Sequence, residues 1–291
     1  MAALSGIDCV RENVPLAERT WFKLGGAAQY FAEPTSVDEL LAVVQRCRDE
    51  GLHVRLLGGG SNVLVRDEGV DGMVVALAHP SFGEINAERR RLTAGGGAKL
   101  ANAITVSVAA GLAGLEPLVG IPGTVGGALH GNAGTHGGDI GQWAQRVTVM
   151  TRGGEILVRE HNDLVFAYRQ SSLDELVILD AQFELEEEDP TELTKRMQKQ
   201  WIVKKANLPM AHENTGCIFK NPRGMSAGML IDQCGLKGQR VGGAEVSQRH
   251  ANFFIAHPGA TAKDVLQLID VVRNRVAERM GVELETEIEI W

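Results

Sequence analysis

The chain has 291 residues, with 44% hydrophobic and 23% charged residues and a formal net charge of −8 at pH 7. These values are typical of a globular protein with one large domain or two to three smaller ones, and the negative charge disfavours nucleic acid or an anionic membrane as the main partner. No run of about 18 apolar residues is present, so we expect no membrane span. The four cysteines are scattered and the first residues do not resemble a signal peptide, so we expect reduced thiols and a cytoplasmic location.

The elements predicted in residues 1–75 are one helix and several short strands. Ser36 to Glu39 has the pattern of a capping box, which predicts a helix that ends near Gly51. Short apolar segments predict strands at the end of residues 20–33, at 54–57 and at 63–65.

A glycine-rich loop, Gly58-Gly-Gly-Ser-Asn62, lies between two of these strands. Successive backbone N–H groups in glycine turns can form a nest for an oxyanion, and Ser61 and Asn62 add side-chain donors. The loop matches neither the P-loop pattern nor a G-x-G-x-x-G that opens a helix. We interpret it as a binding site for a pyrophosphate, and a plain hairpin turn is the alternative.

Residues 76–188 contain a longer glycine-rich stretch from Gly111 to Asp139. Glycine is needed where the backbone adopts positive φ or touches a ligand, and apolar residues fill the gaps here, Ile121, Val125, Ala128 and Leu129 among those expected to be buried. We interpret the stretch as backbone around a large, flat cofactor, with a buried structural loop as the alternative. The other predicted elements are a helix at 98–110, closed by Gly111, and strands at 73–77, 91–94, 147–150, 155–158 and 177–184.

The charged segment 186–190 marks a predicted domain boundary, and residues 189–291 form the domain that follows it. Helical patterns occur at 191–205, 227–234 and 262–280, and strand patterns at 241–246, 252–255 and 283–291. Residues 214–223 are expected to be non-helical. Helix and strand patterns thus occur throughout the chain, and the resemblance described next implies the α+β class.

Six motifs together resemble one protein family. They are TWFKLGG (20–26), LGGGSNVLV (57–65), GIPGTVGG (120–127) with NAG (132–134), YRQS (168–171), GCIFKNP (216–222) and HANF (250–253). In this order and spacing they resemble the UDP-N-acetylenolpyruvoylglucosamine reductase family, in its shorter form, over nearly the whole chain. The resemblance implies two FAD-binding subdomains of the vanillyl-alcohol-oxidase type (1–75 and 76–188) and a C-terminal α/β substrate-binding domain (189–291).

The resemblance also implies an activity. The family reduces UDP-N-acetylglucosamine enolpyruvate to UDP-N-acetylmuramate, a peptidoglycan precursor, with NADPH as co-substrate and non-covalent FAD as cofactor. We therefore expect an enzyme in the cytoplasm, a monomer, with no nucleic acid or membrane partner. The eight histidines show no ligand spacing, so no metal is expected.

Three residues match the family's catalytic positions. Arg169 would stabilise the negative charge that develops on an enediolate-like intermediate. Cys217 stands where the family usually has a serine proton donor, and a thiol with a reference pKa of about 8.5 is a stronger acid than a hydroxyl. Glu287 would assist protonation. The alternatives are a surface arginine, a buried apolar cysteine, and a solvated acidic face that Glu287 shares with the other alternating glutamates of the C-terminal segment.

The remaining site residues fall into two groups. The expected cofactor-binding residues are Gly58, Gly59, Gly60, Ser61, Asn62, Gly120, Ile121, Pro122, Gly123, Thr124, Gly127, Asn132, Ala133 and Gly134. The expected substrate-binding residues are Tyr168, Lys220, Asn221, Gln233, Arg240 and Asn252, with ordinary surface polarity as the alternative.

Two other functions stay open. One is a flavin oxidase or dehydrogenase of the same fold that acts on another substrate. Several such oxidases attach flavin covalently through a histidine in the phosphate-binding loop, and residues 58–62 contain none. The other is a non-catalytic flavin or nucleotide-sugar binding protein, in which Cys217 marks the loss of the proton donor.

Overall fold

The computed structural model describes residues 7–135, 137–207 and 216–291. The chain forms two compact units that interleave along the sequence. The first contains Met1–Asn13, Gln29–Gly59 and Asp71–Val203, and the second contains Val14–Ala28, Gly60–Val70 and Lys204–Trp291. The division at residues 75/76 and 188/189 stays a prediction.

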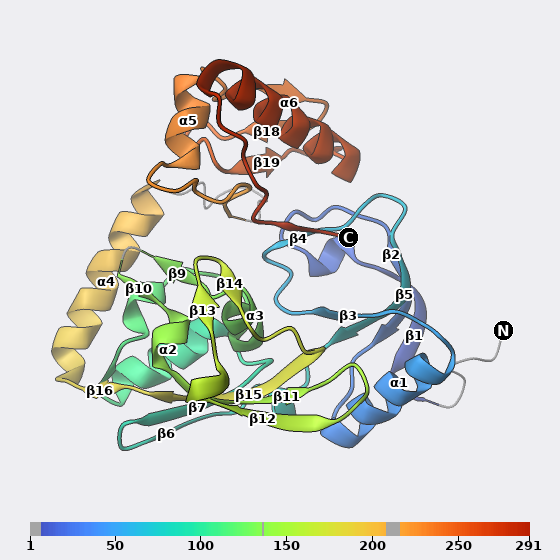
Figure 1. Cartoon of the computed structure of the whole chain (residues 1–291), viewed down its shortest axis with the longest axis vertical. Helices are drawn as coiled ribbons and strands as arrows, with labels where there is room; N and C mark the ends of the chain where they lie inside the picture. Colours follow the sequence, from blue (N-terminus) through green and yellow to red (C-terminus); the bar gives the residue numbers. More distant parts are fainter. Residues whose placement is uncertain (1–6, 136, 208–215) are drawn as a thin grey trace. The chain divides into compact units, whose positions relative to one another are not determined.

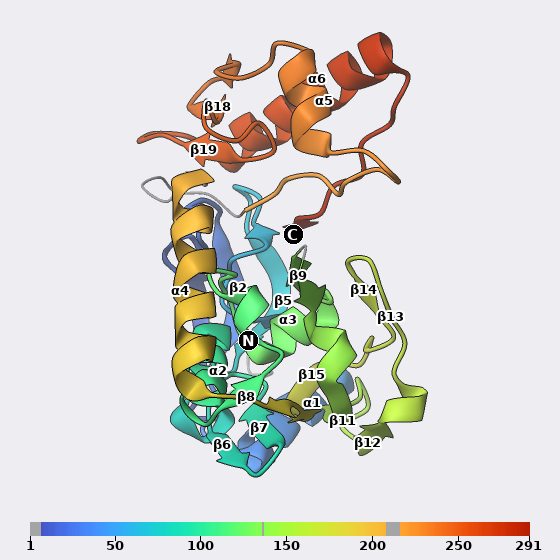
Figure 2. The same ribbon diagram turned by 90° about the vertical axis from the view of Figure 1, so that its left-hand side faces the viewer.

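A five-stranded antiparallel sheet forms the centre of the first unit, in the order β12-β11-β15-β7-β6 (Figure 1). Its strands are β6 (Ile85–Glu88), β7 (Arg91–Gly95), β11 (Ala144–Met150), β12 (Ile156–Glu160) and β15 (Val177–Glu184). Helices α2 (Leu100–Ala109) and α3 (Val125–His130) lie on one side of this sheet (Figures 1 and 2). Fully buried Ile104, Leu129 and Phe183 join both helices to the sheet in one apolar core.

A second sheet of the first unit has the order β1-β2-β5-β3. Its strands are β1 (Val10–Pro15), β2 (Ala27–Ala32), β3 (Val54–Leu57) and β5 (Val70–Ala76), and β3 runs parallel to β5. Helix α1 (Val37–Asp49) packs its buried side chains against this sheet. Only half of the predicted capping box is present, because Ser36 Oγ accepts the Glu39 N–H at 3.2 Å whereas the Glu39 carboxylate accepts the Thr35 N–H at 2.7 Å.

Short elements complete the first unit. They are β8 (Leu112–Ala113) paired with β16 (Glu186–Glu187), β9 (Gly134–Thr135) paired with β10 (Gly138–Asp139), β13 (Phe166–Ala167) paired with β14 (Gln170–Ser171), and helix α4 (Pro190–Asn207). Buried Glu116 anchors α4, since its carboxylate accepts the Gly114 N–H at 2.7 Å and pairs with Arg196 at 2.8 Å. Within the described ranges, no helix has the length and apolar character needed to cross a bilayer.

The second unit contains a three-stranded antiparallel sheet of β17 (Arg240–Val241), β18 (Ala244–Val246) and β19 (Phe254–Ala256), with helices α5 (Ala227–Gln233) and α6 (Ala262–Met280). The single strand expected at 241–246 is wrong. The chain turns back at Gly242, whose φ is +52°, so two short strands form instead. The predicted bounds of α6 are confirmed: Thr261 and Asp264 form a reciprocal capping box, and Gly281 ends the helix at φ +66°.

The long strand expected at 283–291 is also wrong. Only β20 (Glu289–Ile290) is regular, and it pairs in parallel with β4 (Val63–Leu64) in the second unit. Strands β3 and β4 flank the loop 58–62, yet they belong to different sheets. The loop therefore is not a plain hairpin turn, and its role as a pyrophosphate-binding loop stays a prediction.

Candidate active site

The two glycine-rich segments meet within the first unit. A Cβ atom added to Gly59 would lie 2.7 Å from Gly123 Cα, and one added to Gly58 would lie 3.0 Å from Thr124 Oγ1. Gly123 itself has φ +111°, which L side chains rarely adopt. The close approach explains why both segments need glycine. It also brings together two motifs that are far apart in the sequence and share only their high glycine content.

Helix α3 begins beside this contact and leaves part of its backbone open. Thr124 caps the helix by accepting the Gly127 N–H at 3.2 Å. Gly127 is exposed, and an added Cβ would touch only the Thr124 hydroxyl, at 3.4 Å. A glycine within a helix is destabilising by roughly 1 kcal/mol relative to alanine, and the surrounding protein does not require one here. The open backbone therefore fits the close approach of a flat group such as FAD.

Of the residues around this contact that were expected to be buried, only Ile121 is not. Gly120, Pro122, Ala133 and Gly134 are half-buried, and so is Ile121, which was expected in the core. Val125, Ala128 and Leu129 are buried as predicted. Residues 120–124 are therefore partly accessible, whereas the buried side chains of Val125, Ala128 and Leu129 anchor helix α3 in the core.

The rest of the phosphate-loop motif belongs to the second unit. Buried Gly60 has φ +64°, and a Cβ there would overlap the Arg19 carbonyl oxygen at 2.1 Å, so packing alone requires glycine. Ser61 is half-buried. Asn62 donates its side-chain amide to the Glu287 carbonyl at 3.1 Å, and its own carbonyl accepts the Glu289 N–H at 3.0 Å. The end of the loop is thus joined to the segment that carries the expected catalytic glutamate.

Arg169 lies at the tip of a hairpin in the first unit. Tyr168 and Arg169 are the two turn residues between β13 and β14, and Arg169 has φ +56°. The guanidinium donates to the Gly134 carbonyl at 3.1 Å and lies 5.4 Å from the ring of Tyr168, which is 53% exposed. A positive φ in a residue other than glycine is uncommon and costs of order 1–3 kcal/mol, so the surrounding contacts hold this turn in place.

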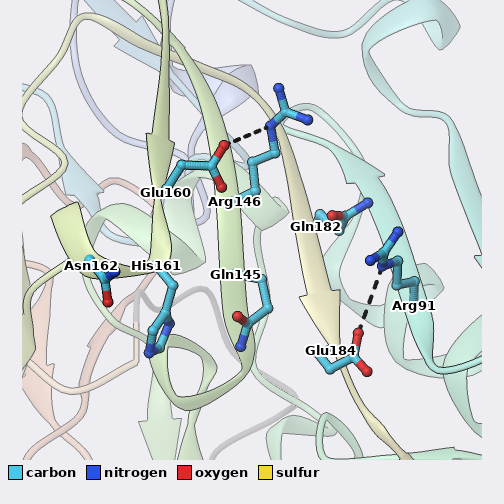
Figure 3. A pocket seen from close by; sticks show the side chains of 8 residues that line it. All are labelled: Arg91, Gln145, Arg146, Glu160, His161, Asn162, Gln182 and Glu184. Atoms are coloured by element: carbon cyan, nitrogen blue, oxygen red, sulfur yellow. Dashed lines mark ion pairs between the residues drawn. The ribbon is translucent and has the colours of Figure 1, made fainter.

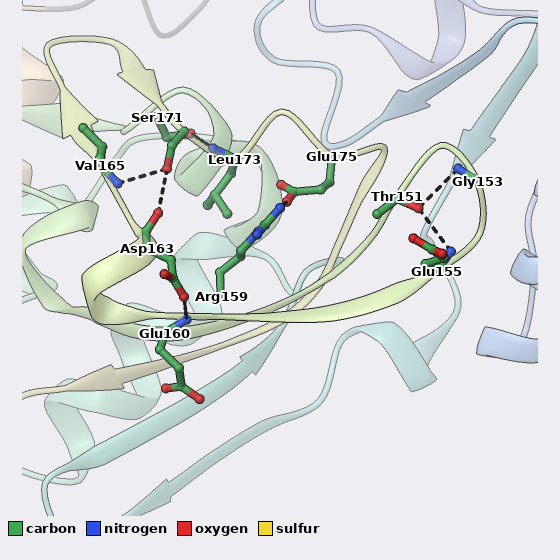
Figure 4. Close-up of polar contacts among 11 residues, drawn as sticks. Thr151, Gly153, Glu155, Arg159, Glu160, Asp163, Val165, Ser171, Leu173 and Glu175 are labelled. Atoms are coloured by element: carbon green, nitrogen blue, oxygen red, sulfur yellow. Dashed lines mark hydrogen bonds and ion pairs between the residues drawn. The ribbon is translucent and has the colours of Figure 1, made fainter.

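The base of this hairpin is closed by hydrogen bonds. The Val165 N–H, labelled in Figure 4, donates to Ser172 Oγ at 3.0 Å. The Ser172 N–H donates to the Val165 carbonyl at 2.8 Å. Ser171 Oγ donates to the His130 carbonyl at 2.7 Å, at the end of α3. The hairpin is therefore fixed at its base, and its tip presents Tyr168 and Arg169.

Cys217 and Glu287 lie on adjacent backbone segments of the second unit. The Glu287 N–H donates to the Ile218 carbonyl at 2.8 Å, and single bridges join Phe219 to Thr286 and Cys217 to Phe253. Cys217 is half-buried, whereas Cys47 is fully buried and burial raises its pKa to about 11. The alternative of a buried apolar cysteine therefore describes Cys47 and not Cys217.

The acidic C-terminal segment does not present one uniform face. Glu283, Glu285 and Glu289 are exposed, whereas Glu287 is half-buried. Glu285 pairs with Lys220 at 2.5 Å. Burial thus separates Glu287 from the other three glutamates, a distinction that the alternating sequence pattern does not make.

The expected substrate-binding residues of the second unit differ in their surroundings. Asn221 Oδ1 accepts the Ala227 N–H at 2.9 Å, next to the start of α5, and Gln233 is exposed at its end. Arg240 pairs with Glu245, which also contacts His257 at 2.8 Å. Burial raises the pKa of Glu245, but hydrogen bonds from His257 and Arg240 outweigh it and hold that pKa below its usual range. Lys220, Gln233 and Arg240 keep polar groups at the surface.

Two residues expected to contact ligands are buried instead. Asn132 is 3% exposed and Asn252 is 1% exposed. Asn252 accepts the Phe219 N–H at 2.9 Å and donates to the Phe219 carbonyl at 2.7 Å. Because both ends of its amide bond to protein backbone, Asn252 does not line a substrate path, and it holds the segment that contains Cys217.

Sequence reasoning missed Asp67 and Glu245. The Asp67 carboxylate accepts the N–H groups of Ala262 and Lys263 at 2.9 and 3.0 Å, so it supports the first turn of α6 from a loop nearly 200 positions earlier in the sequence. No local pattern indicates a partner so distant. Glu245 alternates with apolar neighbours in a strand pattern, which gave no sign of its contacts with Arg240 and His257.

A shallow hollow of about 410 Å³ lies elsewhere in the first unit, on the polar face of the five-stranded sheet (Figure 3). Arg91 pairs there with Glu184 at 3.8 Å, and Arg146 pairs with Glu160 at 3.6 Å. None of the expected site residues lines it. Since its charges balance, the hollow does not select a ligand of either sign. Among the described residues, no cluster of His, Cys, Asp or Glu side chains is arranged to hold a metal ion.

Two family models match this chain. A family model described as "UDP-N-acetylenolpyruvoylglucosamine reductase, C-terminal domain" matches residues 208–291, and one described as "FAD binding domain" matches residues 28–159. The chain is 39% identical to the UDP-N-acetylenolpyruvoylglucosamine reductase of Rhodopirellula baltica, over 98% of this chain and 93% of that protein. It is 40% identical to that of Heliobacterium modesticaldum, over 96% of this chain and 90% of that protein.

A solved structure shows the same architecture. The crystal structure of UDP-N-acetylenolpyruvylglucosamine reductase from Thermus caldophilus matches with a TM-score of 0.83 and 36% identity, over 97% of this chain and 99% of that chain. The predicted combination of an FAD-binding domain and a family-specific C-terminal domain is therefore confirmed. The chain belongs to the UDP-N-acetylenolpyruvoylglucosamine reductase family.

Proposed function

We propose that this chain reduces UDP-N-acetylglucosamine enolpyruvate to UDP-N-acetylmuramate with electrons from NADPH, as a monomer in the cytoplasm. The chain is an FAD-dependent oxidoreductase of its family. The observation that carries the proposal is the backbone pairing that places Cys217 and Glu287 on adjacent segments of the family-specific C-terminal domain. The match to full-length reductases favours this function over an oxidase or a binding protein.

The glycine-rich segments 58–62 and 120–134 would hold FAD, which would supply the hydride chemistry between NADPH and the methylene carbon of the enolpyruvyl ether. The chain's own residues must then stabilise the negative charge that develops at the substrate carboxylate. We assign this role to Arg169, because a guanidinium stays protonated and can donate two parallel hydrogen bonds to a carboxylate. Its anchored, left-handed turn fixes the direction in which those donors point.

We assign the proton donor to Cys217. Cys217 is half-buried, and the Cys217–Phe219 segment is held by Asn252 on one side and by residues 286–287 on the other. Glu287, half-buried on the adjacent segment, would polarise the substrate carboxylate or assist the proton transfer. A proton delivered to the carbon next to the carboxylate completes the reduction.

Phosphate groups of the substrate and NADPH need cationic partners on a chain whose net charge is −8. Lys220 and Arg240 both pair with glutamates, and the Glu285 side chain that pairs with Lys220 is 71% exposed. The Lys220 side chain is 19% exposed and Glu285 lies on the solvent side of the pair, so an incoming phosphate can compete with Glu285 for this lysine. We therefore keep Lys220, Arg240, Asn221, Gln233 and Tyr168 as proposed substrate or NADPH contacts.

The experiment is a product analysis. The purified chain with FAD is incubated with NADPH and UDP-N-acetylglucosamine enolpyruvate, and the sugar nucleotide is examined by mass spectrometry. Gain of two hydrogen atoms by the substrate, matched mole for mole by NADPH consumption, supports the reductase. NADPH consumption at the same rate without the enolpyruvyl substrate, and no change in its mass, contradicts it.

A further inference from the structure

The geometry points to Asn132 as a positioning residue for Arg169 and not as a contact to the cofactor. Asn132 is 3% exposed, so its side chain does not face a ligand surface. Its Nδ2 donates to the Ala167 carbonyl at 2.8 Å, and its Oδ1 accepts the Gly141 N–H at 3.1 Å. Both ends of the amide are therefore bonded to protein backbone.

Ala167 is the last residue of β13, directly before the turn that carries Tyr168 and Arg169. Two residues after Asn132, the Gly134 carbonyl accepts a hydrogen bond from the Arg169 guanidinium at 3.1 Å. One three-residue segment thus holds the hairpin at its backbone and the arginine at its charged end. A shift of Asn132 would move both contacts together.

Few side chains can replace asparagine at this position. Asn132 has φ +44°, which glycine, asparagine and aspartate tolerate best. The position also needs one donor and one acceptor at the same time, which an amide supplies and a carboxylate does not. An aspartate here would accept the Gly141 N–H and place its second oxygen against the Ala167 carbonyl.

The inference rests on the proposed role of Arg169 as the group that stabilises charge on the substrate. A misplacement of about 1 Å in such a group can reduce a rate by about 100-fold. Loss of the Asn132 contacts should therefore slow the transfer of reducing equivalents to the enolpyruvyl substrate, and it should leave reduction of the flavin by NADPH unchanged.

The test uses full-length Asn132→Asp and Asn132→Gly variants, with Asn102→Asp on the exposed face of α2 as a control that has the same charge change. Three quantities are measured for each: the dissociation constant of FAD from flavin fluorescence, and the rates of the two half-reactions from anaerobic stopped-flow absorbance. We expect FAD affinity and the NADPH half-reaction to stay within about two-fold of the parent, and the substrate half-reaction to slow by roughly 10–100-fold.

A double variant decides whether Asn132 acts through Arg169. In an Arg169→Ala background, adding Asn132→Asp should slow the substrate half-reaction no further. Full additivity, a large loss of FAD affinity, or equal slowing of both half-reactions would each overturn the positioning role. A parental substrate half-reaction in Arg169→Ala alone would refute the proposed role of Arg169. A slow Arg169→Ala with parental Asn132 variants would refute only the role of Asn132.

Discussion

The contacts of Asn252 allow a stability prediction whose size follows from the structure. Phe219 is fully buried, and its N–H and carbonyl both bond to the Asn252 side chain, at 2.9 and 2.7 Å. Asn252→Ala leaves both backbone groups buried without these partners, and each such group costs about 1–3 kcal/mol. The expected loss is therefore about 2–6 kcal/mol, a large part of the roughly 5–15 kcal/mol that stabilises a typical folded protein.

The assay is thermal and urea unfolding of the FAD-loaded protein. With about 2–4 °C per kcal/mol for a chain of this size class, Asn252→Ala should lower the melting temperature by roughly 4–24 °C. Asn274→Ala is the matched control, because Asn274 is exposed on α6 of the same unit and should shift stability by no more than about 0.5 kcal/mol. If Asn252→Ala is no less stable than this control, the assignment of Asn252 as the support of the Cys217 segment is wrong.

Three further predictions concern the proton donor, the glycine contact and acid stability. Cys217→Ala should keep the NADPH half-reaction and slow the substrate half-reaction by about 100-fold or more, as loss of a general acid does, while Cys217→Ser should stay active; stopped-flow absorbance measures both. Gly59→Ala should weaken FAD binding by roughly 5–150-fold, measured by flavin fluorescence, because a Cβ 2.7 Å from Gly123 Cα forces the loops apart at about 1–3 kcal/mol. Burial, with a smaller contribution from Lys237, lowers the pKa of His250. As the pH falls through about 6.5, the unfolded chain therefore takes up a proton on this histidine before the folded chain does. The free energy of unfolding should fall as the pH drops below about 6.5 and be restored above it. His250→Gln should reduce this loss, measured by thermal unfolding at a series of pH values.

Each of these predictions has a control and a contradicting outcome. Parental turnover in Cys217→Ala would show that another group delivers the proton. Gly131→Ala is the control for Gly59→Ala, since its added Cβ would come no closer than 3.7 Å to a neighbour, and equal FAD affinities in the two variants would refute the glycine contact. His53→Gln, at an exposed histidine, should leave the pH profile unchanged, and the same profile in His250→Gln and the parent would contradict the role of His250.

Elements whose sequence contains its own boundary signals were predicted well. Helix α6 has a capping box at Thr261, an apolar stripe and a terminal Gly281, and its bounds are as predicted. Strand β15 also has the predicted bounds, since an apolar run with β-branched residues fits a strand at the centre of a sheet. In both cases local chemistry and tertiary packing favour the same structure.

Predictions failed where a single glycine or a distant partner decides the conformation. Residues 241–246 were predicted as one strand, but Gly242 turns the chain and gives two strands. At 283–291 the alternating pattern predicts one strand, but its partners, Phe219 and residues 63–64, come from two different segments. Alternation records which side chains are buried, and it does not record which backbone they pair with.

The site was predictable in its residue types and less so in their roles. The glycine content of residues 58–62 and 111–139 indicated close backbone approaches, but the contact of Gly59 with Gly123 is visible only in the fold. The motifs placed Asn132 and Asn252 near the chemistry, but a motif does not show burial. Their side-chain hydrogen bonds to backbone 33 to 35 residues away give them supporting roles.

The central claim is that this chain moves reducing equivalents from NADPH to an enolpyruvyl sugar nucleotide through FAD. The most direct test is an anaerobic absorbance measurement of the purified, FAD-loaded chain in the oxidised-flavin band. We predict that NADPH bleaches the band and that UDP-N-acetylglucosamine enolpyruvate restores it without oxygen. Bleaching that is reversed only when oxygen is admitted, with no response to the enolpyruvyl substrate, would contradict the account.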